Sequence, residues 1–96
     1  MNTKEKILNW ADAKKITHPD NAKTQMLKTV EEVGELAQGI LKDKNDLIID
    51  AIGDVMVTLI ILADIKGLDI DKCLDHAWNE IKDRTGKTVN GTFIKD

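Results

Sequence analysis

The sequence predicts an all-α protein with a four-helix, antiparallel bundle-like fold and a short extended or hairpin tail at the C-terminus. Of its 96 residues, 42% are hydrophobic but only 3% are aromatic. The core must therefore use Leu, Ile, Val and Ala, which suits helix packing better than a sheet. Apolar residues recur at spacings of three and four, and only short polar turns separate the later segments. We expect one domain over residues 1–96.

The first two helices are separated by a proline. The first is expected at about residues 3–16, and Pro19 disfavours helix in the residue before it. The second is expected at about residues 21–41. It carries an apolar stripe that we expect to face the core, formed by Met26, Val30, Val33, Ala37 and Ile40.

The third helix, at about residues 46–66, is apolar nearly all round, which is typical of a helix touched on all sides. So small a chain can hardly cover it alone, so we expect a helix-mediated homodimer or a dimer of dimers. Gly67 ends this helix, and the fourth is expected at about residues 70–84. The tail, residues 85–96, contains Asn-Gly between β-branched and aromatic residues, a strong hairpin signal.

Two aspartates interrupt the apolar third helix. Asp50 and Asp54 lie one turn apart, about 40° from each other around the helix axis. Burying a carboxylate is costly unless a partner neutralises it. One interpretation is that this strip is exposed near the helix end, or is neutralised by Lys or Arg. The other is that the pair binds a ligand.

A second acidic cluster, "EEVGEL", lies in the second helix and contains Glu31, Glu32 and Glu35. Alone, it would be interpreted as a solvated helix face. Because the second and third helices should be antiparallel, Glu32 and Glu35 can lie at the height of Asp50 and Asp54. Four carboxylates without a neighbouring His or Cys favour Mg²⁺, with Mn²⁺ as an alternative, over Zn²⁺.

The stretches "EEVGEL" and "DAIGDVMVTLIILAD" together resemble the MazG-like nucleoside triphosphate pyrophosphohydrolases, an all-α group. That group carries E-x-x-E on one helix and E-x-x-D on the next. Glu32 and Glu35 match the first motif, and Asp54 matches the end of the second. The expected Glu falls on Ala51, and Asp50 is the nearest substitute. The resemblance extends through "AWNEIKDRTGKTVNGTFIKD" and covers roughly residues 22–96.

The resemblance implies Mg²⁺-dependent hydrolysis of a nucleoside triphosphate, in particular a deoxynucleotide, to the monophosphate and pyrophosphate in nucleotide-pool house-cleaning. It implies metal ligands at Glu32, Glu35, Asp50 and Asp54. Glu35 and Glu31 are candidate catalytic carboxylates that orient or deprotonate water. Asn79, Lys82 and Arg84, near the end of the fourth helix, are candidates for binding phosphates; ordinary surface roles are the alternative.

Two other functions stay open. A non-enzymatic helical dimer of the same fold is the first, and Ala51 at the expected acidic position is its main support. The second is a relative specific for dUTP, dCTP or phosphoribosyl-ATP, because base selectivity depends on pocket shape.

The composition also bears on partners and location. The net charge of −3 disfavours nucleic-acid binding, which normally needs a basic stripe. The aspartates of the third helix disfavour a membrane span. Cys73 is the sole cysteine, so no internal disulfide can form, and a cytoplasmic location is expected.

Overall fold

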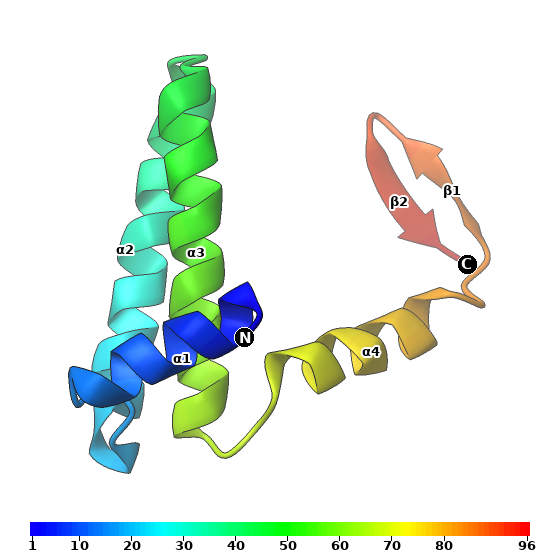
Figure 1. Cartoon of the computed structure of the whole chain (residues 1–96). Coiled ribbons are helices and arrows are strands. Elements are labelled where there is room, and N and C mark those ends of the chain that lie inside the picture. The colour runs from blue at the N-terminus through cyan, green and yellow to red at the C-terminus, as the bar shows by residue number, and fades with distance from the viewer.

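The computed structural model describes residues 1–96 and has four helices followed by a two-stranded hairpin (Figure 1). The elements are α1 (Thr3–Ala13), a single 3₁₀ turn (Pro19–Asn21), α2 (Ala22–Leu41), α3 (Asn45–Ile65), α4 (Ile70–Ile81), β1 (Gly86–Val89) and β2 (Thr92–Lys95). The all-α class and the terminal hairpin are thus confirmed. None of the helices is long and apolar enough to span a membrane.

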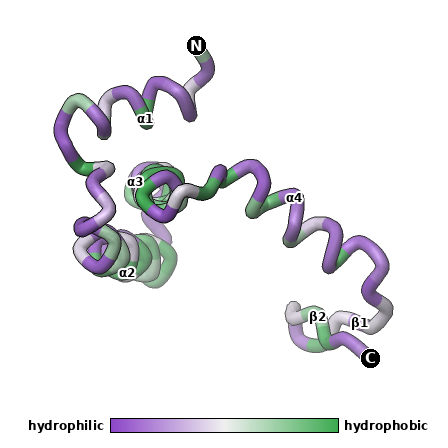
Figure 2. Tube along the Cα trace, turned by 90° about the horizontal axis from the view of Figure 1, so that it is seen from below, coloured by the Kyte–Doolittle hydropathy of each residue, from purple (hydrophilic) through white to green (hydrophobic).

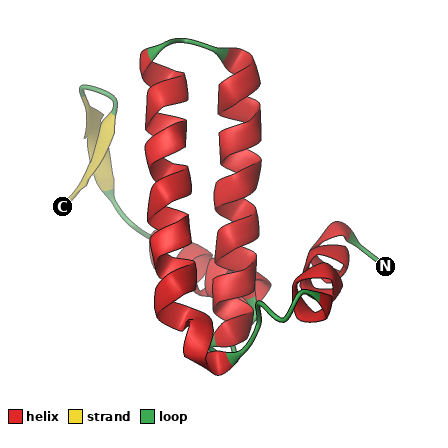
Figure 3. Ribbon diagram, turned by 90° about the vertical axis from the view of Figure 1, so that its left-hand side faces the viewer, coloured by secondary structure: helices red, strands yellow, loops and turns green.

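The antiparallel pair of α2 and α3 forms the centre of the molecule, and a tight turn joins the two helices (Figure 3). Helix α1 packs on the lower part of α3, where Ala11, Ile61 and Ile65 form a small buried cluster. Helix α1 ends at Ala13 and not near residue 16, because the chain turns at Lys15, whose φ of 62° is not helical.

Small and polar residues line the contact between α2 and α3. The buried residues of α2 are Gln25, Thr29, Glu32 and Gly39. Gln25 Nε2 donates a hydrogen bond of 3.1 Å to the carbonyl oxygen of Thr58 on α3. On the α3 side, Ala51 and Thr58 are buried. The close approach of the two backbones therefore depends on small side chains and one buried amide bridge.

The apolar stripe of α2 does not face the core of its own chain, and this expectation was wrong. Its large side chains are about half exposed, at 47% for Met26, 56% for Val30, 48% for Val33 and 59% for Ile40. The stripe has the period of a helix face, but the opposite, polar side of α2 contacts α3. Helix α3 is likewise not covered all round within one chain, because Ile49, Ile52 and Met56 are exposed.

Helix α4 and the hairpin form a C-terminal arm, defined here as residues 70–96. Figure 2, which looks along α2 and α3, shows α4 leaving α3 on the side away from α1 and α2. Helix α4 ends at Ile81, a few residues before the expected end. Strands β1 and β2 pair antiparallel, with Gly86 opposite Lys95, around the turn Asn90–Gly91. Neither strand packs extensively on the helices.

The side chain of Lys4 fixes the start of the arm. Gly67, with φ at 72°, ends α3, and Asp69 caps α4 by accepting a hydrogen bond from the N–H of Asp71. Lys4 Nζ of α1 lies 3.1 Å from Asp69 Oδ1 and also contacts Asp71. The backbone N–H of Asp71, followed by Lys4, lowers the pKa of Asp69 below its usual 3.8.

This contact predicts a loss of helix order in acid. A carboxyl group whose pKa is lowered by folding stabilises the fold above its ordinary pKa, and the contribution disappears as pH falls through the lowered value. We expect the helical signal in far-ultraviolet circular dichroism to fall between about pH 5 and pH 2. This loss of signal should be smaller in Asp69→Asn than in the wild type. Asp75→Asn, on the exposed side of α4, is the matched control. An identical acid profile in all three proteins would contradict the assignment.

Candidate metal centre

Three carboxylates from the two central helices converge on one point. One oxygen each from Glu32, Glu35 and Asp54 can be chosen so that all three lie within 4.8 Å of one another. Glu32 and Glu35 are one turn apart on α2, and Asp54 faces them from α3. Three oxygen ligands at this separation form a cluster that fits a hard divalent cation.

Glu32 is the buried member of the cluster, with 7% of its surface exposed. Its Oε1 lies 3.4 Å from Lys28 Nζ, while its Oε2 is buried and has no hydrogen-bond partner. Buried polar atoms without a partner are rare in folded proteins and costly. A buried carboxylate oxygen in this position can be satisfied either by the proton of a neighbouring carboxyl group or by a cation.

The carboxylates of Glu32 and Glu35 repel each other within the cluster. The pKa of Glu35 is raised above its usual 4.5, first because Glu32 hydrogen-bonds to its protonated form and second because the Glu32 charge repels its ionised form. Two adjacent carboxyl groups of this kind favour sharing one proton. A divalent cation bound between them can replace that proton.

Lys28 is a charged neighbour of the cluster that sequence reasoning missed. Its Nζ lies 3.2 Å from Glu31 Oε1, and the carboxylates of Glu31 and then Glu32 raise its pKa. Glu31 is exposed, pairs with Lys28 and is not part of the converging group. The signal was present in the sequence, since Lys28 precedes Glu31 and Glu32 by three and four residues, a spacing that pairs charges along a helix.

Asp50 and Ala51 are placed differently from the acidic trio. Asp50 is exposed and does not join the group of converging ligands. Ala51, at the position where the family pattern has Glu, is buried with 4% exposed, and so it lies in the contact between α2 and α3. A longer acidic side chain there would have to find room in that contact.

Asn79, Lys82 and Arg84 are not brought to the cluster within one chain. All three are exposed and belong to the arm, which has no extensive contact with α2 (Figure 1). Lys82 and Arg84 line a shallow cavity of about 470 Å³ together with Trp78, Ile81 and Phe93. Within one chain these side chains therefore do not reach the acidic cluster.

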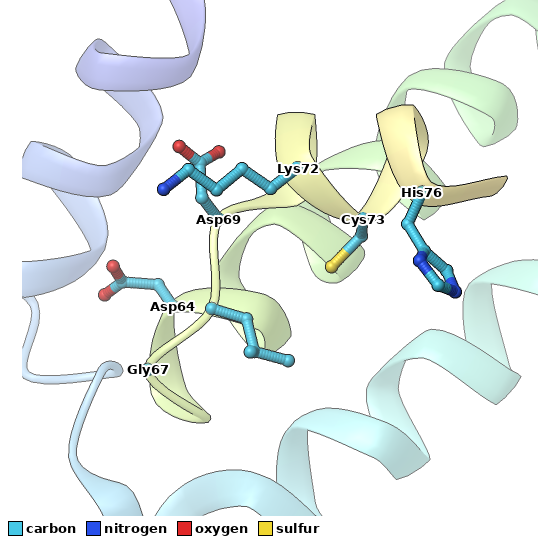
Figure 4. Close-up of a pocket in the computed structure, with 7 residues that line it drawn as sticks. Asp64, Gly67, Asp69, Lys72, Cys73 and His76 are labelled. Carbon is cyan, nitrogen blue, oxygen red and sulfur yellow. The ribbon is translucent and has the colours of Figure 1, made fainter. Parts of the chain in front are cut away.

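A separate open cavity of about 710 Å³ lies where α3 meets α4 (Figure 4). Asp64, Asp69 and Lys72 line one part of it, while Cys73 and His76 project from the same side of α4. His76 Nε2 lies 3.0 Å from Glu80 on the exposed surface. No third ligand converges with Cys73 and His76, so the acidic trio is the one metal-like group in the chain.

Comparison with known families decides the relationship. A family model described as the MazG nucleotide pyrophosphohydrolase domain matches residues 20–89. The chain belongs to the MazG family. The match contains the whole α2–α3 pair and the acidic trio, and it extends through α4 into β1. The resemblance drawn from "EEVGEL" and the apolar helix after it is thereby confirmed.

One curated relative is an uncharacterized 18.2 kDa protein in the rep-hol intergenic region of Haemophilus phage HP1 (strain HP1c1). It is 39% identical over 69 residues, which cover 72% of this chain and 41% of the relative. The chain thus matches about two fifths of that relative's length. No solved structure matches this MazG-family chain.

Proposed function

We propose that the protein hydrolyses a nucleoside triphosphate, in particular a deoxynucleoside triphosphate, to the monophosphate and pyrophosphate in a Mg²⁺-dependent reaction. The observation that carries the proposal is the convergence of Glu32, Glu35 and Asp54 within 4.8 Å beside an unpartnered buried carboxylate oxygen. Family membership supports the pyrophosphohydrolase class. Part of the proposal is a cytoplasmic house-cleaning role on the nucleotide pool.

The three carboxylates are proposed to hold the cation, Mg²⁺ or alternatively Mn²⁺. When bound, such an ion neutralises phosphate charge and makes a coordinated water more acidic. Asp50, exposed one turn before Asp54, is proposed as an outer ligand that reaches the ion through water or helps hold a second one. Because Asp50 is outside the converging trio, its removal should cost less than removal of Asp54.

Glu35 and Glu31 are proposed as the carboxylates that orient or deprotonate the attacking water. Glu35 has the better position, because it is exposed yet belongs to the converging trio. Glu31 pairs with Lys28 outside the trio, so it would act on the water less directly than Glu35. Lys82, Arg84 and Asn79 are proposed to bind phosphate oxygens, and their place on the arm requires that they come from a second copy. A homodimer is therefore part of this proposal.

The first test is a panel of common and damaged nucleoside triphosphates assayed for pyrophosphate release with Mg²⁺ or Mn²⁺. We expect release from at least one of them. Asp54→Asn should lower the rate at least about 100-fold, since it removes a direct ligand, and Asp50→Asn about 10-fold. A larger loss in Asp50→Asn than in Asp54→Asn would reverse the assigned ligand order.

The second candidate function is a non-enzymatic helical dimer of the same fold, favoured by the buried Ala51. It predicts no pyrophosphate from any nucleotide of the panel and no rise in melting temperature with Mg²⁺. Specificity for dUTP, dCTP or phosphoribosyl-ATP would instead appear in the same panel as release from that substrate alone.

A further inference from the structure

The cavity at the end of α4, here named the arm cavity, combines aromatic rings with positive charge. Its volume is about 470 Å³, and it is lined by Trp78, Ile81, Lys82, Arg84 and Phe93. It has two cations and no carboxylate, although the whole chain carries a net charge of −3. The cavity of Figure 4 and the groove between α3 and α4 each include at least one aspartate. The arm cavity is therefore suited to an anion that has an aromatic part.

The backbone at the end of α4 places both cations beside Trp78. Lys82 N donates a hydrogen bond of 2.9 Å to the carbonyl oxygen of Trp78. Lys82 therefore lies one helical turn after Trp78, on the same side of the helix. Arg84 N donates a hydrogen bond of 3.1 Å to the carbonyl oxygen of Ile81, which keeps Arg84 close to the helix end.

The base of the hairpin brings Phe93 to the same cavity. Asp96 N donates a hydrogen bond of 3.0 Å to the carbonyl oxygen of Thr85, and Thr85 Oγ1 lies 2.9 Å from Asp96 Oδ2. These bonds close the hairpin directly after α4. A Cβ at Gly86 would lie 2.8 Å from Phe93 Cζ and would also collide with the carbonyl oxygen of Ile94. Glycine at this position therefore leaves room for the Phe93 ring.

Neither aromatic ring is covered by the rest of the chain. Trp78 is 58% exposed and Phe93 is 49% exposed. Exposed aromatic rings bind nucleobases by stacking, a contact that tolerates any base because every base has a π-face. Lys and Arg are the side chains that bind phosphate oxygens. A ligand with both parts is a nucleotide. Apart from the two cations, the lining side chains offer one hydrogen-bond donor, the indole N–H of Trp78.

We propose that the arm cavity is a nucleobase subsite, in which the base of a nucleoside triphosphate stacks on Trp78 and Phe93. Lys82 and Arg84 bind the phosphate groups of the same nucleotide. Because stacking uses the face of the base and not its edge, the subsite accepts all common bases and binds the larger purines more tightly than pyrimidines. That this nucleotide is the substrate rests on the proposed hydrolysis, whereas the binding itself needs no metal.

Quenching of tryptophan fluorescence tests the stacking in the full-length chain. Trp10→Phe leaves Trp78 as the single tryptophan, and EDTA prevents metal-dependent turnover during the titration. We expect dATP to quench Trp78, and dCTP and dTTP to bind with affinities up to about 10-fold weaker. Inorganic triphosphate should leave the intensity nearly unchanged. Equal effects of inorganic triphosphate and dATP, or a response to one base alone, would overturn the subsite.

Two pairs of variants locate the nucleotide. Phe93→Leu removes the ring and should weaken dATP binding about 10-fold, whereas Ile94→Leu, on the opposite face of β2, should leave it unchanged. Lys82→Gln should weaken it about 5-fold, and Lys87→Gln removes the same charge outside the cavity without this effect. If both members of a pair lose affinity equally, or neither loses any, the nucleotide does not lie in the arm cavity and the proposal fails.

Photolabelling of the wild-type chain avoids any loss of folding in a variant. The protein is irradiated with 8-azido-dATP in EDTA, and labelled peptides are identified by mass spectrometry. We expect label on the peptides that contain Trp78 or Phe93, and excess dATP should prevent it. Label only on α1, α2 or α3 would contradict the subsite. If these peptides are labelled but no nucleotide releases pyrophosphate with Mg²⁺, the proposed hydrolysis fails and the subsite stands.

Discussion

Glu32→Gln is expected to abolish Mg²⁺-dependent hydrolysis and, at the same time, to stabilise the metal-free protein. Glu32 is buried beside Glu35, and its Oε2 lacks any partner. An amide in its place removes the charge that repels Glu35 and can donate a hydrogen bond to it. We expect a gain of about 1–3 kcal/mol without metal, the usual range for relieving an unsatisfied buried group. Catalysis should fall at least about 100-fold, because a direct ligand is lost.

Melting temperatures in EDTA and in Mg²⁺ separate the two effects. The wild type should gain stability on adding Mg²⁺, and Glu32→Gln should start higher and gain little. Glu31→Gln is the matched control, since Glu31 is exposed and paired with Lys28, and it should not raise the melting temperature in EDTA. A drop in the EDTA melting temperature of Glu32→Gln would mean that its pairing with Lys28 is structural and that no cation is needed there.

Gly39→Leu is expected to separate α2 from α3 and to weaken both the fold and the metal site. A Cβ at Gly39 would lie 3.3 Å from the backbone nitrogen and from Cγ1 of Ile48, and 3.4 Å from Leu47 Cβ. The backbone atom cannot move aside without moving α3. Overpacking of this kind costs about 1–3 kcal/mol. Glu35 lies one turn before Gly39, so the cluster should also bind its cation less tightly.

Gly34→Ala is the control for this substitution. A Cβ at Gly34 meets nothing within 4 Å, so the change should stabilise α2 by about 1 kcal/mol through helix propensity alone. Urea unfolding gives the stabilities, and calorimetric titration with Mn²⁺ gives the affinity of the cluster. Equal Mn²⁺ affinity in Gly39→Leu and wild type would show that the site tolerates a wider separation of the helices.

Local signals in the sequence predicted local structure well. Gly67 ends α3 and Asn90–Gly91 forms the hairpin turn, because each depends on a few neighbouring residues. The convergence of Glu32, Glu35 and Asp54 was also foreseeable. It follows from helical spacing on two antiparallel helices joined by a short turn.

The sequence could not reveal which part of the molecule packs against each apolar helix face. The stripe containing Met26 and Val30 has the period of a buried face, but a period does not say whether the cover comes from the same chain. The same limit applies to Asp50. Its position one turn from Asp54 allowed it to join the cluster, but in the folded chain Asp50 is exposed and outside the converging trio. Long-range geometry, and not residue type, decides both cases.

Because few side chains are buried, the survival of this protein in the cell should depend on its concentration. Only 10 of 96 residues are buried, and no large side chain is fully buried. If association with a second copy supplies the missing core, folding and association are one event, and the melting temperature rises with protein concentration. Chains made in small numbers would stay unfolded long enough for proteases to remove them, so the cell would hold either a substantial pool or almost none.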